Sequence, residues 1–197
     1  ELFILEKMIK RGQIILDVNL NINKNGKIEN DYVIKGFVKG ASINFLNQAK
    51  FKNINFNFNF KKNNYLLNEI TFKAEEINFI SKKLNIKKKK NGFLIDGVLK
   101  NELSSINSNV FQLLNFNFEN IILDNVKFKT DNKFSLLLDK KFKVNNMILN
   151  SDININQLKY KKPDIFENYL SDVDNLILLD NHKLNLNYKD SNLSIKG

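Results

Sequence analysis

The sequence has no cysteine, no tryptophan, one proline and one histidine among its 197 residues. Without cysteine, the chain has no disulfide framework, no thiol nucleophile and no cysteine-based zinc site. A Ser-His-Asp triad could be built only on His182, and no nucleophile elbow, Gly-rich phosphate loop or HExxH motif accompanies it. We therefore interpret His182 as a surface residue, and the sequence predicts neither an enzyme nor a metal or cofactor site.

Long hydrophobic runs are also missing from the sequence. The longest, such as residues 2–5 and 176–179, fall far short of the roughly 20 apolar residues that a membrane-spanning helix needs. No secretory signal is visible. The sequence opens on Glu1 and stops on Gly197 inside a strand-like pattern, so we expect a segment of a longer protein whose anchor or signal lies upstream. Residues 1–197 form a single segment, with a soft internal boundary near 101–109 where the strand pattern weakens.

The charge is strongly positive, with 31 Lys+Arg against 21 Asp+Glu and a formal net charge of +10. Asn, Lys, Ile and Phe, which share A/T-rich codons, are all abundant, so part of this charge reflects genome composition. The strongest basic cluster is 87–90, joined by Lys82 and Lys83. It could contact nucleic acid or anionic lipid headgroups, or it could be a solvated hairpin rim, which we favour. Nucleic acid binding is disfavoured because the aromatic residues lie on the apolar faces and Arg11 is the only arginine.

The dominant pattern is an alternation of apolar and polar residues with a period of two. It is clearest over residues 14–22 and over residues 54–60, where phenylalanines alternate with asparagines. Successive side chains of a strand point to opposite faces, so each such segment has one apolar and one polar face. This pattern predicts an antiparallel sheet that is solvated on one side, built from about ten to twelve short strands.

Turn residues separate the alternating runs. Candidate turns lie at residues 24–26, 62–64, 90–92, 130–132 and 180–181, all rich in Asn, Asp or Gly. Two short helices are predicted, one over residues 1–11 with Gly12 as its stop and one over residues 163–170 with Pro163 at its start. Residues 103–114 are ambiguous.

A long sheet with one apolar face must cover that face. It can fold into a sandwich, close into a barrel, take a helix lid or bind an apolar ligand. Two short helices are too few to cover about ten strands, so an open groove for an acyl chain is one remaining solution. A sixteen-carbon chain gains on the order of 12 kcal/mol by leaving water. The residues that we predict to line the groove are Ile14, Leu16, Val18, Leu20, Ile54, Phe56, Phe58 and Phe60; the competing interpretation is that they fill the interior of a closed sandwich.

Several segments resemble the repeating strand-turn-strand unit of AsmA-like proteins, the TamB and YhdP group. They are GQIILDV at 12–18, NGKI at 25–28 and IKGFV at 34–38. NKFSL at 132–136 with KFKV at 141–144, and DNHKLNLNY at 180–188 followed by NLSIKG at 192–197, are similar to other recurring segments of that family. The resemblance implies an elongated, curved β-sheet with an apolar groove, anchored in the inner membrane of a Gram-negative bacterium. It also implies that the protein moves glycerophospholipids across the periplasm towards the outer membrane.

The expected fold is therefore mainly β: an elongated, curved antiparallel sheet shaped like a groove, with one or two short helices. The first hypothesis for function is a non-enzymatic lipid-transfer segment in the periplasm. Its partners would be phospholipid acyl chains, and membranes through parts outside this segment, with no cofactor and no nucleic acid. The second hypothesis is a structural or adhesive β-domain of the envelope, folded as a sandwich or solenoid with no lipid path.

Overall fold

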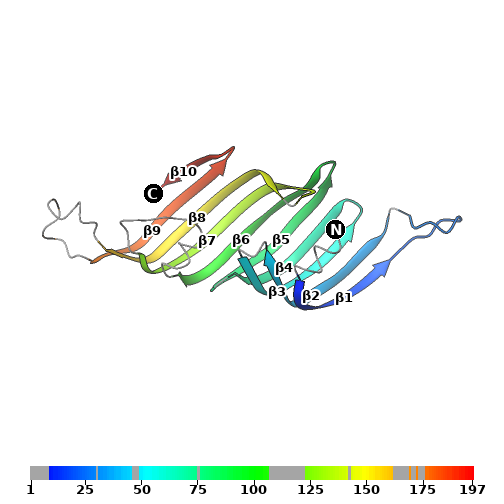
Figure 1. Cartoon of the computed structure of the whole chain (residues 1–197), viewed down its shortest axis with the longest axis horizontal. Helices are drawn as coiled ribbons and strands as arrows, with labels where there is room; N and C mark the ends of the chain where they lie inside the picture. The colour runs from blue at the N-terminus through cyan, green and yellow to red at the C-terminus, as the bar shows by residue number, and fades with distance from the viewer. Residues whose placement is uncertain are drawn as a thin grey trace.

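The computed structural model describes residues 9–29, 31–45, 49–74, 76–106, 123–141, 143–161, 169, 172 and 176–197. These residues form a single open antiparallel sheet of ten strands in the order β1-β2-β3-β4-β5-β6-β7-β8-β9-β10 (Figure 1). Each strand is hydrogen-bonded to the strand that precedes or follows it in the sequence. No helix occurs in this part of the chain. The prediction of a mainly β, antiparallel fold is confirmed.

The strands are long. They are β1 (Ile9–Asn19), β2 (Val33–Phe45), β3 (Ala49–Lys61), β4 (Asn64–Ala74), β5 (Ile77–Lys89), β6 (Gly92–Ile106), β7 (Leu123–Asp139), β8 (Val144–Lys161), β9 (Leu176–Lys189) and β10 (Asn192–Lys196). Strands of globular proteins usually have 3–10 residues, whereas β8 has 18. The predicted number of strands is confirmed, but the prediction that they are short is wrong for every strand except β10, which has five residues.

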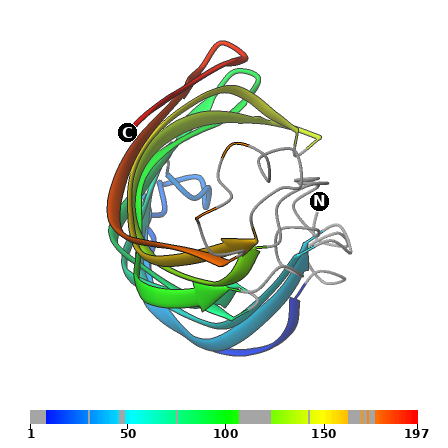
Figure 2. The same ribbon diagram turned by 90° about the vertical axis from the view of Figure 1, so that its left-hand side faces the viewer.

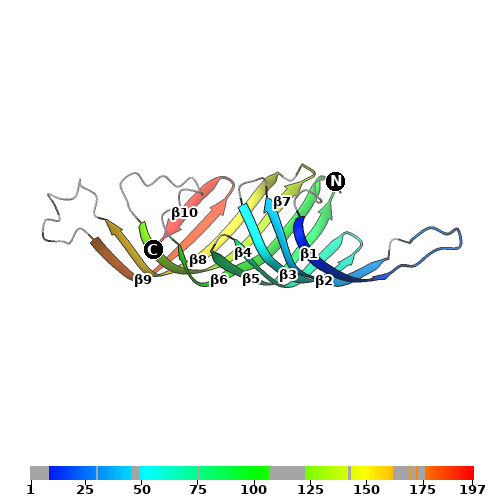
Figure 3. The same cartoon turned by 60° about the horizontal axis from the view of Figure 1, so that its bottom comes forward.

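The sheet curls along its length into a trough. Viewed from one end, the ribbons follow a C-shaped path (Figure 2), and the long axis of the trough crosses the strands (Figure 3). The bending has a local cause in the first strands, where the register shifts lie in one zone. Gly12, Gly40, Asn53 and Glu69 have φ values of 148°, 62°, 53° and 49° in this zone. Bulges of this kind bend a strand and increase its twist, so their alignment bends the whole sheet.

The Asn55 side chain connects these bulges. Its Oδ1 accepts a hydrogen bond from the Gly40 backbone N–H at 2.9 Å. Its Nδ2 donates to the Asn53 carbonyl at 2.8 Å and to the Thr71 hydroxyl at 3.0 Å. One amide therefore joins β2, β3 and β4, and it satisfies backbone groups that the bulges remove from the regular ladder.

Three predicted turns are confirmed. Residues 24–26 form a turn closed by the Ile22–Ile28 bridge, and residues 62–64 and 90–92 join β3 to β4 and β5 to β6. Gly26 and Asn63 have φ values of 72° and 58°, which glycine and asparagine tolerate.

Two predicted turns are wrong. Residues 130–132 lie inside β7 and residues 180–181 inside β9, where Asn181 has a φ of 58°.

The predicted helix over 1–11 is wrong for residues 9–11, which belong to β1 because Ile9 and Arg11 pair with β2. Residues 1–8, and residues 163–170 apart from the exposed Tyr169, lie outside the described part.

The region of the expected soft boundary is covered in part. Residues 101–106 belong to β6, and the pairing of β6 with β7 continues as far as Ile106 opposite Val126. Residues 107–109, and residues 107–114 of the ambiguous segment, lie outside the described part. Over its described residues, the sheet is continuous here.

The apolar core lies within one layer. Its buried centre is Val38, Ala41, Ile54 and Phe58, on β2 and β3. Extensive residue contacts occur only between strands that are hydrogen-bonded neighbours. Within the described ranges, then, no second sheet packs against the first, and the core forms between side chains on one face of the same sheet.

Candidate functional site

One face of the sheet carries an unbroken row of apolar and glycine residues. The row crosses all ten strands through residues that pair directly: Leu16, Gly36, Phe58, Leu67, Leu84, Gly97, Phe134, Leu149, Tyr188 and Leu193. A second row runs beside it from β1 to β7: Val18, Ile34, Phe60, Tyr65, Ile86, Ile95 and Leu136. We call the face with these rows the inner face and the opposite one the outer face. With neighbouring strands about 4.8 Å apart, the ten-strand row is about 43 Å long.

Ring positions indicate that the inner face is concave. Phe58 and Phe60 are two residues apart on β3, a separation of about 6.6 Å along a strand, yet their ring centroids are 4.8 Å apart. Tyr65 and Phe93 lie on β4 and β6, about 9.6 Å apart with β5 between them, and their centroids are 6.3 Å apart. The side chains converge both along and across the strands, as they do on the hollow side of a curved sheet.

Two glycines make room for this convergence. A Cβ at Gly36 would lie 2.7 Å from Cζ of Phe58, and one at Gly97 would meet Cδ2 of Leu84. Each glycine therefore provides the space into which the large side chain of the neighbouring strand leans. These glycines serve packing on the inner face rather than a turn.

The eight predicted groove residues come from the first three strands and their edge. Ile14, Leu16 and Val18 lie on β1 opposite Val38, Gly36 and Ile34, which in turn pair with Phe56, Phe58 and Phe60. Ile54 pairs with Ala41 beyond the bulge, and Leu20 follows the end of β1. Seven of the eight therefore share the inner face, and Leu20 continues the alternation of β1.

Their exposure falls sharply from the edge inward. Ile14 and Leu16 are 58% and 54% exposed, whereas Ile54 and Phe58 are buried. β1 is the edge strand of the sheet, so its inner-face side chains have neighbours on one side only. Ile14 and Leu16 are thus accessible to a ligand, whereas Ile54 and Phe58 support the floor.

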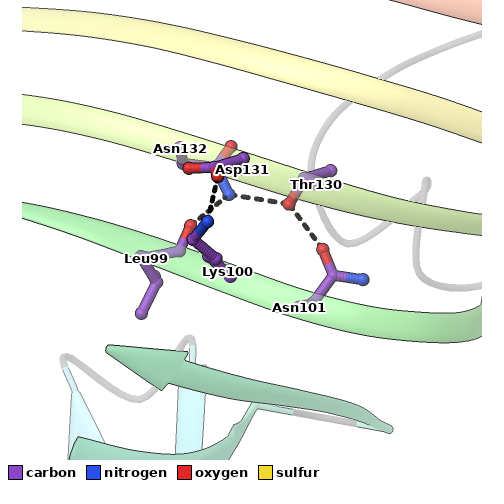
Figure 4. Close-up of polar contacts among 6 residues, drawn as sticks. All are labelled: Leu99, Lys100, Asn101, Thr130, Asp131 and Asn132. Atoms are coloured by element: carbon purple, nitrogen blue, oxygen red, sulfur yellow. Dashed lines mark hydrogen bonds and ion pairs between the residues drawn. The ribbon is translucent and has the colours of Figure 1, made fainter. Parts of the chain in front are cut away.

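A polar seam that the sequence analysis missed crosses the inner face on β6, β7 and β8, and Figure 4 shows its β6 and β7 residues. The Ser151 hydroxyl donates to Oδ1 of Asn132 at 2.6 Å, and Nδ2 of Asn132 donates to the Thr130 hydroxyl at 2.7 Å. The Thr130 hydroxyl donates in turn to Oδ1 of Asn101 at 2.5 Å. Asn101 and Ser151 are buried, and their polar groups find partners within the seam or on the backbone. At these positions, the buried polar groups of the seam therefore have hydrogen-bond partners and avoid the free-energy cost of an unpaired buried group.

The signal for the seam was present in the alternation. Thr130 and Asn132 occupy inner-face positions between Phe128 and Phe134 at a spacing of two. Because they flank Asp131, the same residues indicated a turn. Asp131 points to the outer face, where its carboxylate forms an ion pair with Lys100 (Figure 4).

The outer face is mainly polar, although Ile15, Phe37 and Ile80 are exposed on it, and it carries shallow depressions. One of them, about 740 Å³, crosses β4 to β8, and its lining includes Glu69, Lys82, Lys83, Lys133 and Asp152 as well as the apolar Ile80 and Val98. Asn187 donates to Asn150 at 2.5 Å and Asn185 to Asp152 at 2.8 Å, so amide ladders tie β9 to β8. The mixed charges that line this depression are typical of a solvated surface.

Among the described residues, two titratable groups have clearly shifted pKa values. Burial raises the pKa of Tyr65, and the nearby Tyr32 adds to the shift. Backbone N–H groups, first that of Lys143 and also that of Lys141, lower the pKa of Asp139 in the turn between β7 and β8.

Acidic and histidine side chains do not gather into a possible metal site anywhere in the described ranges. Those same ranges also contain no helix that is long and apolar enough to span a bilayer. The inner face of the described part carries exposed apolar side chains, among them Ile14, Leu16 and Val18.

Comparisons with known proteins add no relative. No protein family, no curated protein and no solved structure matches this chain.

Proposed function

We propose that this chain is a non-enzymatic lipid-transfer segment whose inner face carries phospholipid acyl chains. The observation that supports the proposal is the apolar row that crosses all ten strands on a concave face. Contacts between methylenes and such a surface are non-directional, and each buried methylene contributes about 0.8 kcal/mol. A lipid can therefore move along the row without breaking specific bonds.

The dimensions suit this role. The row of about 43 Å exceeds the roughly 30 Å thickness of the hydrocarbon core of a bilayer, so it is longer than two acyl chains placed end to end. More than one lipid can lie along the trough. The charged and amide side chains of the outer face keep the same sheet compatible with water.

The resemblance to AsmA-like proteins supports the wider setting that we propose. In this setting the segment belongs to the periplasmic part of an inner-membrane-anchored protein, carries phospholipids between the inner and outer membranes and supports outer-membrane biogenesis. Parts outside this segment would contact the membranes. No catalytic residue, cofactor or nucleic acid enters the proposal.

The alternative is a structural or adhesive β-domain of the envelope with no lipid path. The amide ladders between β8 and β9 favour it, because they stiffen the sheet without serving a ligand. A sandwich would require a second sheet against the inner face, and the described strands form one sheet only.

Lipid extraction from the purified chain, followed by mass spectrometry, separates the two functions. The lipid-transfer proposal expects phospholipid to be recovered with the wild-type protein. The double variant Ile14→Asp, Leu16→Asp places charges on the exposed part of the inner face and is expected to reduce the recovered lipid. Phe58 is unsuited to this test because it is buried in the core cluster, where Asp would unfold the sheet.

The matched control is Ile15→Asp. Ile15 lies between the two test residues on the same strand and is 61% exposed, but it belongs to the outer face. Its variant is expected to retain lipid. Absence of lipid from the folded wild-type protein, or equal loss in the test and control variants, would refute the assignment of the inner face and favour the structural role.

A further inference from the structure

Three consecutive hairpins at one rim of the trough bring lysines together. The turns that join β3 to β4, β5 to β6 and β7 to β8 all lie at the same ends of the strands. They are neighbours, because Asn64 pairs with Lys87 and Gly92 pairs with Asp139. The Lys88 backbone N–H also donates to the Asn63 carbonyl at 2.9 Å. We call the exposed lysines of these hairpins the basic rim: Lys61, Lys62, Lys87, Lys88, Lys89, Lys90, Lys140, Lys141 and Lys143.

Genome composition alone does not explain this placement. The segments that connect the strands at their other ends, between β2 and β3, β4 and β5, β6 and β7, and β8 and β9, contain one lysine, Lys162, whereas the connections of the three rim hairpins, residues 62–63, 90–91 and 140–143, contain five. The same segments contain many carboxylates: Glu75, Glu76, Glu119, Asp164, Glu167, Asp172 and Asp174. A codon bias towards lysine would act on both sets of connections equally. The segregation of charge therefore points to a function of the rim.

The basic rim borders the inner face directly. Lys88 follows Ile86 by two residues on β5, so it belongs to the inner face, and it pairs with Phe93. The rings of Tyr65 and Phe93 converge from the strands on either side of β5. A lysine stem beside such rings lies along apolar surface while its ammonium reaches water. Lys88 thus stands at the boundary between the apolar trough and solvent.

The rim lysines are available to an anionic ligand. In the described ranges, the ion pairs are Lys73 with Glu76 and Lys100 with Asp131, and neither includes a rim lysine. The Asp139 carboxylate within the rim accepts backbone N–H groups of Lys141 and Lys143 at 2.8 Å and 2.9 Å. Successive hairpins are about 10 Å apart, close to the Debye length of about 8 Å at physiological salt. Their positive potentials therefore overlap into a strip along the trough.

We propose that the basic rim binds the phosphate of phospholipids whose acyl chains lie on the inner face, and that it selects anionic headgroups. This inference rests on the lipid-transfer function proposed above. A lipid in the trough must keep its headgroup in water at a rim, and lysine ammonium groups donate charge-assisted hydrogen bonds to phosphate oxygens. An anionic headgroup such as that of phosphatidylglycerol leaves the phosphate charge uncompensated, whereas phosphatidylcholine neutralises it internally.

The test uses the purified full chain and vesicles that contain equal amounts of phosphatidylglycerol and phosphatidylcholine with identical acyl chains. After incubation, the protein is separated from the vesicles, and the bound lipids are quantified by mass spectrometry. The wild-type chain is expected to enrich phosphatidylglycerol by about tenfold, with the enrichment falling as salt is raised. The variant with Lys87, Lys88, Lys89 and Lys90 all changed to Ser is expected to lose most of the enrichment while the total bound lipid is retained.

A matched control removes the same charge from the outer face by changing Lys52, Lys127, Lys129 and Lys183 to Ser. All four are exposed, and their side chains alternate with inner-face residues. The control is expected to keep the enrichment. If the first variant fails to fold, as judged by circular dichroism, the triple change of Lys140, Lys141 and Lys143 to Ser tests a separate hairpin of the same rim.

The outcomes distinguish this inference from the function on which it rests. Equal recovery of the two lipids by the wild-type chain, or equal loss of enrichment in the rim and control variants, overturns the headgroup selection alone. Failure to recover either lipid overturns the lipid-transfer function and the selection with it. Free glycerol 3-phosphate at millimolar concentration is expected not to displace the lipid. Displacement by it, or by a short single-stranded DNA, would show that the rim is a general phosphate site and overturn the assignment to lipid headgroups.

Discussion

Placing a methyl group at Gly97 tests the geometry of the inner face. A Cβ at this position would meet Cδ2 of Leu84 and approach the Lys83 carbonyl oxygen at 3.1 Å. Overpacking by one methyl group costs about 1–3 kcal/mol. Because Leu84 is half-buried and its end can move, we expect Gly97→Ala to lower the free energy of unfolding by about 2 kcal/mol.

Truncating the opposing side chain should relieve the clash. Leu84→Ala alone is expected to cost about 2 kcal/mol, at the lower end of the range for buried leucines because Leu84 is partly exposed. In the double variant, the new methyl group at position 97 occupies space that the leucine has left. We expect the double variant to be more stable than the sum of the single effects predicts, by about 1–2 kcal/mol.

Urea denaturation measures all three variants, with circular dichroism and tyrosine fluorescence as probes. Coincident transitions would establish that the two-state treatment is valid. The control pair is Gly97→Ala with Val98→Ala, since Val98 neighbours Gly97 but belongs to the outer face. If the double variant of Gly97 and Leu84 changed the free energy of unfolding by the sum of the two single changes, within about 0.5 kcal/mol, the claim that inner-face side chains of adjacent strands converge would be refuted.

Two further predictions concern the bulges and the turn between β7 and β8. Asn55→Ala removes the three hydrogen bonds by which the Asn55 side chain connects β2, β3 and β4. It is expected to lower the free energy of unfolding, measured by urea denaturation, by about 1–3 kcal/mol. The control Asn57→Ala, in the same strand, should change this free energy by less than about 1 kcal/mol. The pKa of Asp139 is lowered in the folded state, so its contribution to stability is present above the ordinary carboxyl pKa and is lost as the pH falls through the folded value. Asp139→Asn should flatten the dependence of stability on pH in this acidic range, and an unchanged dependence would contradict the role of the Lys141 and Lys143 backbone groups.

The alternation of residues predicted the sheet, its antiparallel pairing and the shared face of seven of the eight groove residues. The prediction succeeded because a strand that buries one face has apolar residues at every second position. The Asn and Gly turns at Gly26, Asn63 and Gly92 agree with this alternation. The number of strands followed from the same pattern.

The length of the strands and the line of bending could not be predicted in this way. Asn53 and Asn181 have positive φ values inside strands, as turn asparagines do, so the sequence does not distinguish a bulge from a turn. Thr130 and Asn132 likewise indicated a turn, although hydrogen bonds to Asn101 and Ser151 stabilise them within a strand. What separates these cases is pairing with the adjacent strands, whose partner residues lie 19 to 29 positions away and so outside any local pattern. The basic rim also needed the topology, since its lysines come from three separate hairpins.

Because each strand makes strong contacts only with its immediate neighbours, the architecture grows in one dimension. Adding or deleting a whole hairpin would change how far the sheet extends while leaving the cross-section of the remaining part intact. Duplication of a two-strand unit could therefore lengthen such a sheet in evolution without redesigning any interior.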